Sequence, residues 1–73
     1  MTYKGVDPAA ITPEMAVRIR VWRVVEELSW RAVAQAASDL WDAEYGGNQL
    51  YGRDLCAAAA KVLGEDPHRE PWN

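Results

Sequence analysis

Hydrophobic residues at helical spacing mark the first element of the chain, which we predict over residues 13–28. Its main apolar stripe recurs at i, i+4, i+7 and i+11 and consists of Val17, Val21, Val24 and Leu28. The β-branched alternation in residues 17–21 also suits a strand, but it breaks in the residues that follow, so the wider window favours a helix. Thr12 can cap free N–H groups at the start, and Pro13 suits the first helical position. We expect the main stripe to face the core.

The same helix carries a second apolar stripe. Met15, Ile19 and Trp22 recur on another face. A helix with two apolar stripes is either surrounded by neighbours in a compact fold or presents one stripe to a partner. We therefore predict that Met15, Ile19 and Trp22 form a partner-binding surface.

The clearest amphipathic pattern begins directly after Leu28. Ser29 can cap a second helix, whose apolar face recurs at i, i+3, i+4, i+7, i+10 and i+11. The residues of this face are Trp30, Val33, Ala34, Ala37, Leu40 and Trp41. Because no loop separates the first two helices, they must meet at a sharp corner. Residues 42–47 form the next break, where Gly46 and Gly47 can adopt positive φ.

A third helix is predicted from a cap at Asn48 to about Leu63, with Gly64 in the usual position after a helix end. Its inward face consists of Tyr51, Leu55, Ala58, Ala59 and Val62. Residues 1–11 read as an irregular arm, and residues 65–73 as a tail that extends over the surface and is pinned by Trp72. The pattern predicts an all-α protein, a compact three-helix bundle in a single small domain with its core in residues 12–64.

Composition supports a folded chain and limits its partners. The sequence has 73 residues, 49% of them hydrophobic and 26% charged, which is typical of one small globular domain. Its net charge of -3 gives no general attraction to nucleic acid or to anionic membranes, so either partner would need a local basic patch. One Cys forms no internal disulfide, so we expect a cytoplasmic protein in which Cys56 is buried. We expect no leader and no membrane span.

Catalytic chemistry finds little support in the residue types. His68 is the only His and lies in the polar tail, which leaves no His/Cys cluster for zinc and no nucleophile–His pair. The Gly46-Gly47 pair lacks the spacing and the Lys of a phosphate-binding loop. Glu26 and Glu27 are adjacent in a helix and would point into water. We therefore predict no enzymatic activity, no cofactor and no metal.

Two segments resemble the tri-helical helix-turn-helix domains of DNA-binding proteins. The first is Leu28-Ser29-Trp30-Arg31-Ala32-Val33-Ala34, which resembles the family's capped first motif helix. The second is Gly47-Asn48-Gln49-Leu50-Tyr51-Gly52-Arg53, which resembles its glycine-bearing turn and polar-headed later helix. In that family the later helix enters the major groove. The resemblance implies that Asn48, Gln49 and Arg53 touch DNA, with Arg31 as a further DNA-binding residue.

Two functions remain open from the sequence. The first is a helix-turn-helix-like module that binds DNA as a homodimer, since a single unit offers few phosphate contacts. Residues 48–64 carry a charge of +1, which makes the third helix the candidate DNA-binding face. The second is a protein-interaction module with the same fold, which presents the surplus stripe to another copy or to a different protein.

Overall fold

The computed structural model describes residues 3–72, so the first two residues of the arm and the last residue of the tail lie outside it. Its elements are a 3₁₀ turn η1 (Pro8–Ala10), helix α1 (Pro13–Arg20), a π-helical turn η2 (Val21–Val25), helix α2 (Trp30–Trp41) and helix α3 (Gln49–Val62). The described residues contain three α-helices and no strand, which confirms the predicted all-α, three-helix architecture.

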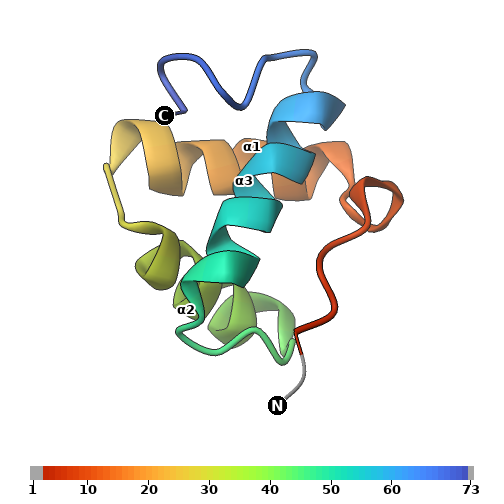
Figure 1. Cartoon of the computed structure of the whole chain (residues 1–73), viewed down its shortest axis with the longest axis vertical. Helices are drawn as coiled ribbons and strands as arrows, with labels where there is room; N and C mark the ends of the chain where they lie inside the picture. Colours follow the sequence, from red (N-terminus) through yellow and green to blue (C-terminus); the bar gives the residue numbers. More distant parts are fainter. Residues whose placement is uncertain (1–2, 73) are drawn as a thin grey trace.

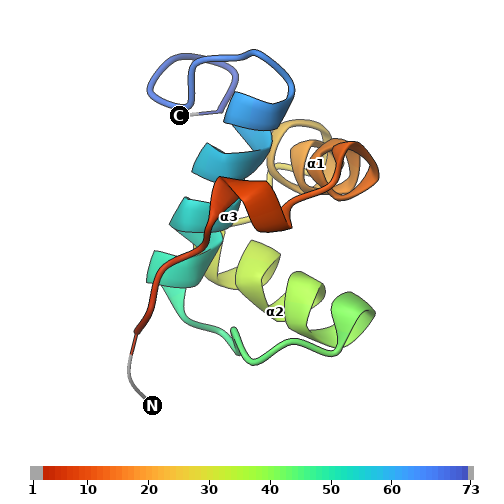
Figure 2. The same ribbon diagram turned by 90° about the vertical axis from the view of Figure 1, so that its right-hand side faces the viewer.

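Helix α3 is the centre of the arrangement. Helices α1 and α2 each run across it, α1 at its C-terminal half and α2 at its N-terminal half (Figures 1 and 2). The side chains at the heart of the core are Ile11, Ala16, Ile19, Trp22, Val33, Ala37, Leu55, Cys56, Ala58, Ala59, Ala60 and Trp72. The small residues of α3 let both neighbours approach closely, as its sequence predicts.

Local capping places the start of each helix where the sequence predicts it. The Thr12 Oγ1 accepts a hydrogen bond from the N–H of Met15 at 3.2 Å, and the Ser29 Oγ accepts one from Ala32 at 3.2 Å. The Asn48 Oδ1 accepts one from the N–H of Leu50 at 2.9 Å. Each cap satisfies an N–H group that has no partner inside its helix.

The first helix differs from its prediction in both length and orientation. Its α-helical part ends at Arg20, and a wider π turn follows, in which the N–H of Glu26 donates to the carbonyl of Val21 at 2.9 Å. Ile19 is fully buried and Trp22 is 8% exposed, whereas Val17 is 53% exposed. The expectation that the main stripe faces the core was therefore wrong at Val17, although Val24 and Leu28 do pack against the core. The expectation that the surplus stripe faces a partner was wrong.

The π turn explains the part of this difference that concerns residues after Arg20, whereas the burial of Ile19 and the exposure of Val17 are set by how α1 itself packs. One additional residue in a turn changes the direction of every later side chain by about 100° relative to a regular α-helix. The shift applies to Val24 within η2, which packs partly buried against the core; Leu28 also packs there, but it follows Glu27, whose φ of 55° has already turned the chain out of the helix. Val17 precedes the shift and stays on the outside. A stripe counted at constant helical spacing thus joined residues from two different faces.

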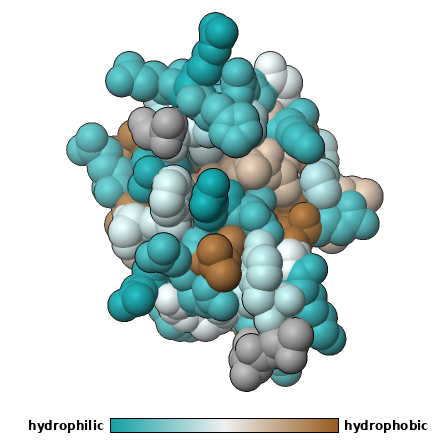
Figure 3. Space-filling model, in the orientation of Figure 1, coloured by the Kyte–Doolittle hydropathy of each residue, from teal (hydrophilic) through white to brown (hydrophobic). Residues whose placement is uncertain are grey.

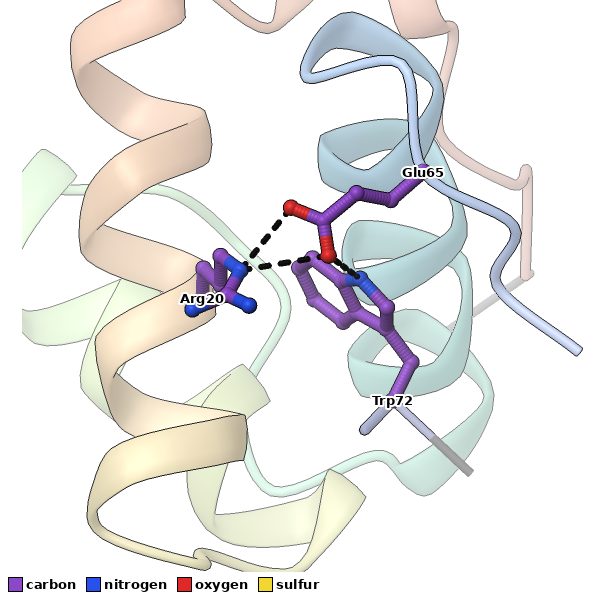
Figure 4. Close-up of polar contacts among 3 residues, drawn as sticks. All are labelled: Arg20, Glu65 and Trp72. Carbon is purple, nitrogen blue, oxygen red and sulfur yellow. Dashed lines mark hydrogen bonds and ion pairs between the residues drawn. The ribbon is translucent and has the colours of Figure 1, made fainter. Parts of the chain in front are cut away.

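The tail is anchored at its end, as predicted from Trp72. The Trp72 indole is 2% exposed, and its Nε1 donates to the Glu65 Oε1 at 3.0 Å. The Arg20 Nε forms an ion pair with the Glu65 Oε2 at 2.9 Å, so one carboxylate joins the end of α1 to the tail (Figure 4). The hydrogen bond from Arg20 holds the pKa of Glu65 below its usual value. The tail itself folds into turns and is not extended, because backbone bonds such as Trp72 N–H to Arg69 O at 3.0 Å close it.

Candidate nucleic-acid interface

The four predicted DNA-binding residues lie at one end of the molecule. Asn48, Gln49 and Arg53 belong to the cap and first turns of α3, and Arg31 belongs to the first turn of α2; all four are exposed. The two helix starts meet because Gly52 has no side chain: an ideal Cβ there would lie 1.7 Å from the carbonyl oxygen of Trp30. The backbones of α2 and α3 therefore touch.

The same contact brings Arg31 beside the turn before α3. Its Cγ lies 3.4 Å from the position that a Cβ would occupy on Gly47, so its aliphatic part covers the turn. Among residues 3–72, neither Arg31 nor Arg53 forms an ion pair. Both cations are therefore available to an anionic partner, Arg31 beside the turn before α3 and Arg53 in the first turns of α3.

Trp30 orients the second of these cations. The guanidinium carbon of Arg53 lies 5.7 Å from the centroid of the Trp30 ring, and that of Arg23 lies 5.0 Å away. Arg23 is fully used within the chain, because it also donates to the carbonyl of Leu28 at 2.8 Å and to that of Trp72 at 3.1 Å. Within residues 3–72, Arg53 has the ring contact and no hydrogen bond or ion pair, and its side chain is exposed.

The polar residues at the start of α3 have different roles. The amide oxygen of Asn48 is used in the helix cap, so this residue serves mainly to begin α3. Gln49 is exposed and directly follows the cap. Leu50 lies next to it and is 43% exposed, which makes it one of the few large apolar side chains on the outside. Leu50 was not among the predicted site residues, although its position beside the inward Tyr51 marks it as an apolar residue outside the inward stripe.

The N-terminal arm contributes to this face, which the sequence did not indicate. The Tyr3 hydroxyl donates to the carboxylate of Asp54, and its ring packs edge-on against Tyr51 at 5.0 Å between centroids. The backbone N–H of Lys4 donates to the Tyr51 hydroxyl at 3.2 Å. The arm thus runs along α3 (Figure 2). Its Tyr3 binds Asp54, the acidic residue of α3, and its Lys4 adds a cation beside this helix.

A shallow cleft of about 460 Å³ lies between the arm, α3 and the tail. Tyr3, Leu50, Arg53 and His68 are among the side chains that line it. Figure 3 shows that this side of the molecule is mostly hydrophilic and that its apolar residues form separate small patches. Such a surface is suited to polar recognition more than to a broad hydrophobic contact.

The predicted partner-binding residues do not form a surface. Ile19 and Trp22 lie in the core, where the Trp22 ring packs on Trp41 at 5.3 Å between centroids, and Met15 is half-buried against the same core. The prediction of a partner-binding stripe at these positions was therefore wrong. The exposed apolar residues of this segment are instead Val17, at 53%, and Val25, at 68%.

Comparison with known proteins does not add a family to this geometry. No protein-family model, no curated protein and no solved structure matched the chain.

Three chemical features complete the description. Within residues 3–72, no helix is both long and apolar enough to cross a membrane, and no three metal-ligating side chains come together. Cys56 is buried as predicted, and this burial raises the pKa of its thiol to about 11. A thiol in that state is a packing group and a poor nucleophile at neutral pH.

Proposed function

We propose that this chain is a small helix-turn-helix-like DNA-binding module in which the start of α3 enters the major groove. The observation that supports the proposal best is the grouping of Arg31, Gln49 and Arg53 at one exposed end, with neither Arg held by a carboxylate among residues 3–72. A helix start with exposed polar side chains is the part that reads base edges in this mode of binding.

Each residue has a distinct role in the proposal. Gln49 can form two hydrogen bonds with the major-groove edge of adenine, and Arg53 can do the same with guanine. Leu50, at 43% exposure, can contact the methyl group of thymine. Arg31 is assigned to phosphate, because it flanks the turn that precedes α3. Asn48 acts through the cap, which sets the direction of the helix.

The electrostatics predict weak binding by one copy. Lys4, Arg31 and Arg53 are the cations on this side, whereas Arg20 and Arg23 are held by contacts within the chain. On a duplex without the specific site, Arg53 has no particular guanine to bind and would neutralise a phosphate like the other two cations. Three phosphate contacts correspond to a slope of about -2.7 for log affinity against log salt. A dissociation constant in the range of about 10⁻⁴ to 10⁻⁶ M is expected for such non-specific contacts. Two copies acting together would double the number of contacts. The single buried Cys is compatible with a cytoplasmic site of action.

Fluorescence anisotropy with a labelled mixed-sequence duplex tests the proposal. Binding is measured from about 50 to 200 mM salt for the wild type and for Arg31→Ala and Arg53→Ala, with circular dichroism to confirm that each variant folds. Each substitution should reduce the salt slope by about one. Lys61→Ala is the matched control, since this cation lies at the far end of the same helix and should leave binding unchanged. Absence of binding at about 50 mM salt, or equal loss in the control, would overturn the proposal.

A further inference from the structure

The outer face of the first helical segment is an apolar stripe that residues 3–72 leave largely uncovered. Val17, Val21 and Val25 follow one another at intervals of four, on the side opposite Ile19 and Trp22. Val17 is 53% exposed and Val25 is 68% exposed. The π turn η2 keeps Val25 in line with Val21, because a wider turn brings the fourth residue back to nearly the same direction.

Charged residues flank this stripe along one edge. Glu14 and Arg18 line a shallow depression together with Val17 and Val21, and Glu26 follows Val25 at the other end. Among residues 3–72, neither Arg18 nor Glu26 has an ion-pair partner. After Glu14 at its very start, the stripe therefore has the positive Arg18 next to Val17 and the negative Glu26 next to Val25.

We propose that the stripe binds a second copy of this chain in an antiparallel, two-fold arrangement centred on Val21. In this pairing Val21 packs on Val21 of the second copy, and Val17 packs on Val25 of the second copy. A two-fold axis perpendicular to the helices leaves the charged edges of both copies on the same side. Arg18 then faces Glu26 of the second copy, and the pair occurs twice because the interface is symmetric. A parallel pairing would not oppose these charges, so charge complementarity selects the antiparallel one.

The size of the face sets the expected strength. Leu40, 54% exposed at the end of α2, borders the same region through a depression that it shares with Met15 and Arg18. Three valines, one leucine and the flanking charges cover less than the roughly 800 Å² per partner of a standard stable interface. The dimer is therefore weak, with an expected dissociation constant of about 10 to 100 µM.

Sedimentation equilibrium of the whole chain over about 5 to 500 µM tests the pairing without DNA. The wild type should pass from monomer to dimer within this range. Val25→Lys places a charge in the contact between Val25 and Val17 of the second copy, so it should weaken association at least tenfold. Gln35→Lys is the matched control: it adds the same charge at an exposed position of α2, outside the stripe, and should associate like the wild type.

A charge exchange tests the orientation. Arg18→Glu and Glu26→Arg should each weaken the dimer several-fold, because each opposes like charges, and the double exchange should restore wild-type association. A wild type that remains monomeric at about 500 µM would overturn the proposal, as would a dimer that Val25→Lys leaves intact or a double exchange that restores nothing. The stripe lies away from Gln49 and Arg53, so this result is independent of whether the chain binds DNA.

Discussion

Replacing Gly52 by Ala tests the central feature of the fold, which is the contact between the backbones of α2 and α3. Gly52 lies inside α3 and is buried. A Cβ built there would lie 1.7 Å from the carbonyl oxygen of Trp30 and 2.5 Å from its carbonyl carbon. Both atoms belong to the backbone of the first turn of α2, so no side-chain rotation can relieve the overlap.

Two effects of opposite sign decide the magnitude. Ala is better than Gly inside a helix by about 1 kcal/mol, which favours the variant. To relieve the overlap, α2 must move away from α3 by roughly 1 Å or more. Overpacking of this kind lowers the free energy of unfolding by about 1 to 3 kcal/mol and sometimes more. Because the obstacle is backbone and the overlap is severe, we expect the upper part of this range or beyond. The net loss is then about 2 kcal/mol, from a total stability of about 4 to 11 kcal/mol for a chain of this length.

Thermal unfolding followed by circular dichroism measures this effect. For a domain of this size, a loss of about 2 kcal/mol lowers Tm by roughly 8 to 16 °C. Gly47→Ala is the control, because the three atoms nearest to its Cβ, at 3.4 to 3.9 Å, all belong to the flexible side chains of Arg31 and Gln35. Its Tm should change by no more than about 3 °C. If Gly52→Ala melts at or above the temperature of the wild type, the reasoning about the α2–α3 contact is wrong.

Three further predictions concern single groups. The buried Cys56 thiol, whose pKa is raised to about 11, should react with a thiol reagent at pH 8 at least about 100-fold more slowly in the native than in the unfolded chain; equal rates would contradict its burial. The pKa of Glu65 is lowered by its hydrogen bond from Arg20, so its stabilising contribution is complete above the unfolded pKa and is lost as pH falls through the folded pKa. The stability of the wild type relative to Glu65→Gln should therefore decline below about pH 4 in thermal melts from pH 3 to 7, and a constant difference would refute the assignment. Ser29→Ala removes the cap on the N–H of Ala32 and should cost about 1 kcal/mol, or roughly 4 to 8 °C in Tm, whereas Ser29→Asp should melt close to the wild type.

The candidate interface shows which parts of a site can be inferred from sequence. The resemblance selected Gln49, Arg53 and Arg31, and the structure places all three at one exposed end. Leu50 and the arm at Tyr3 were missed. The arm reaches α3 through contacts with residues about fifty positions away, and no local pattern in residues 1–11 indicates them. Whether these residues meet DNA remains a prediction.

The sequence alone determined the start of every helix, because a cap depends on residues two or three positions apart. Thr12, Ser29 and Asn48 make the bonds that their positions predict. It also determined the small-residue face of α3, since a regular helix keeps its spacing throughout.

Only the tertiary structure decided which face of the first helix is buried. Within α1, packing against α3 buries Ile19 and leaves Val17 exposed, and a π turn at Val21–Val25 then changes the direction of later side chains, which constant helical spacing cannot anticipate. The path of the tail also depends on tertiary contacts, because Glu65 joins Arg20, 45 positions earlier, to the Trp72 indole. Contacts between distant residues form only when the helices pack, and they are what separate the buried Ile19 from the exposed Val17.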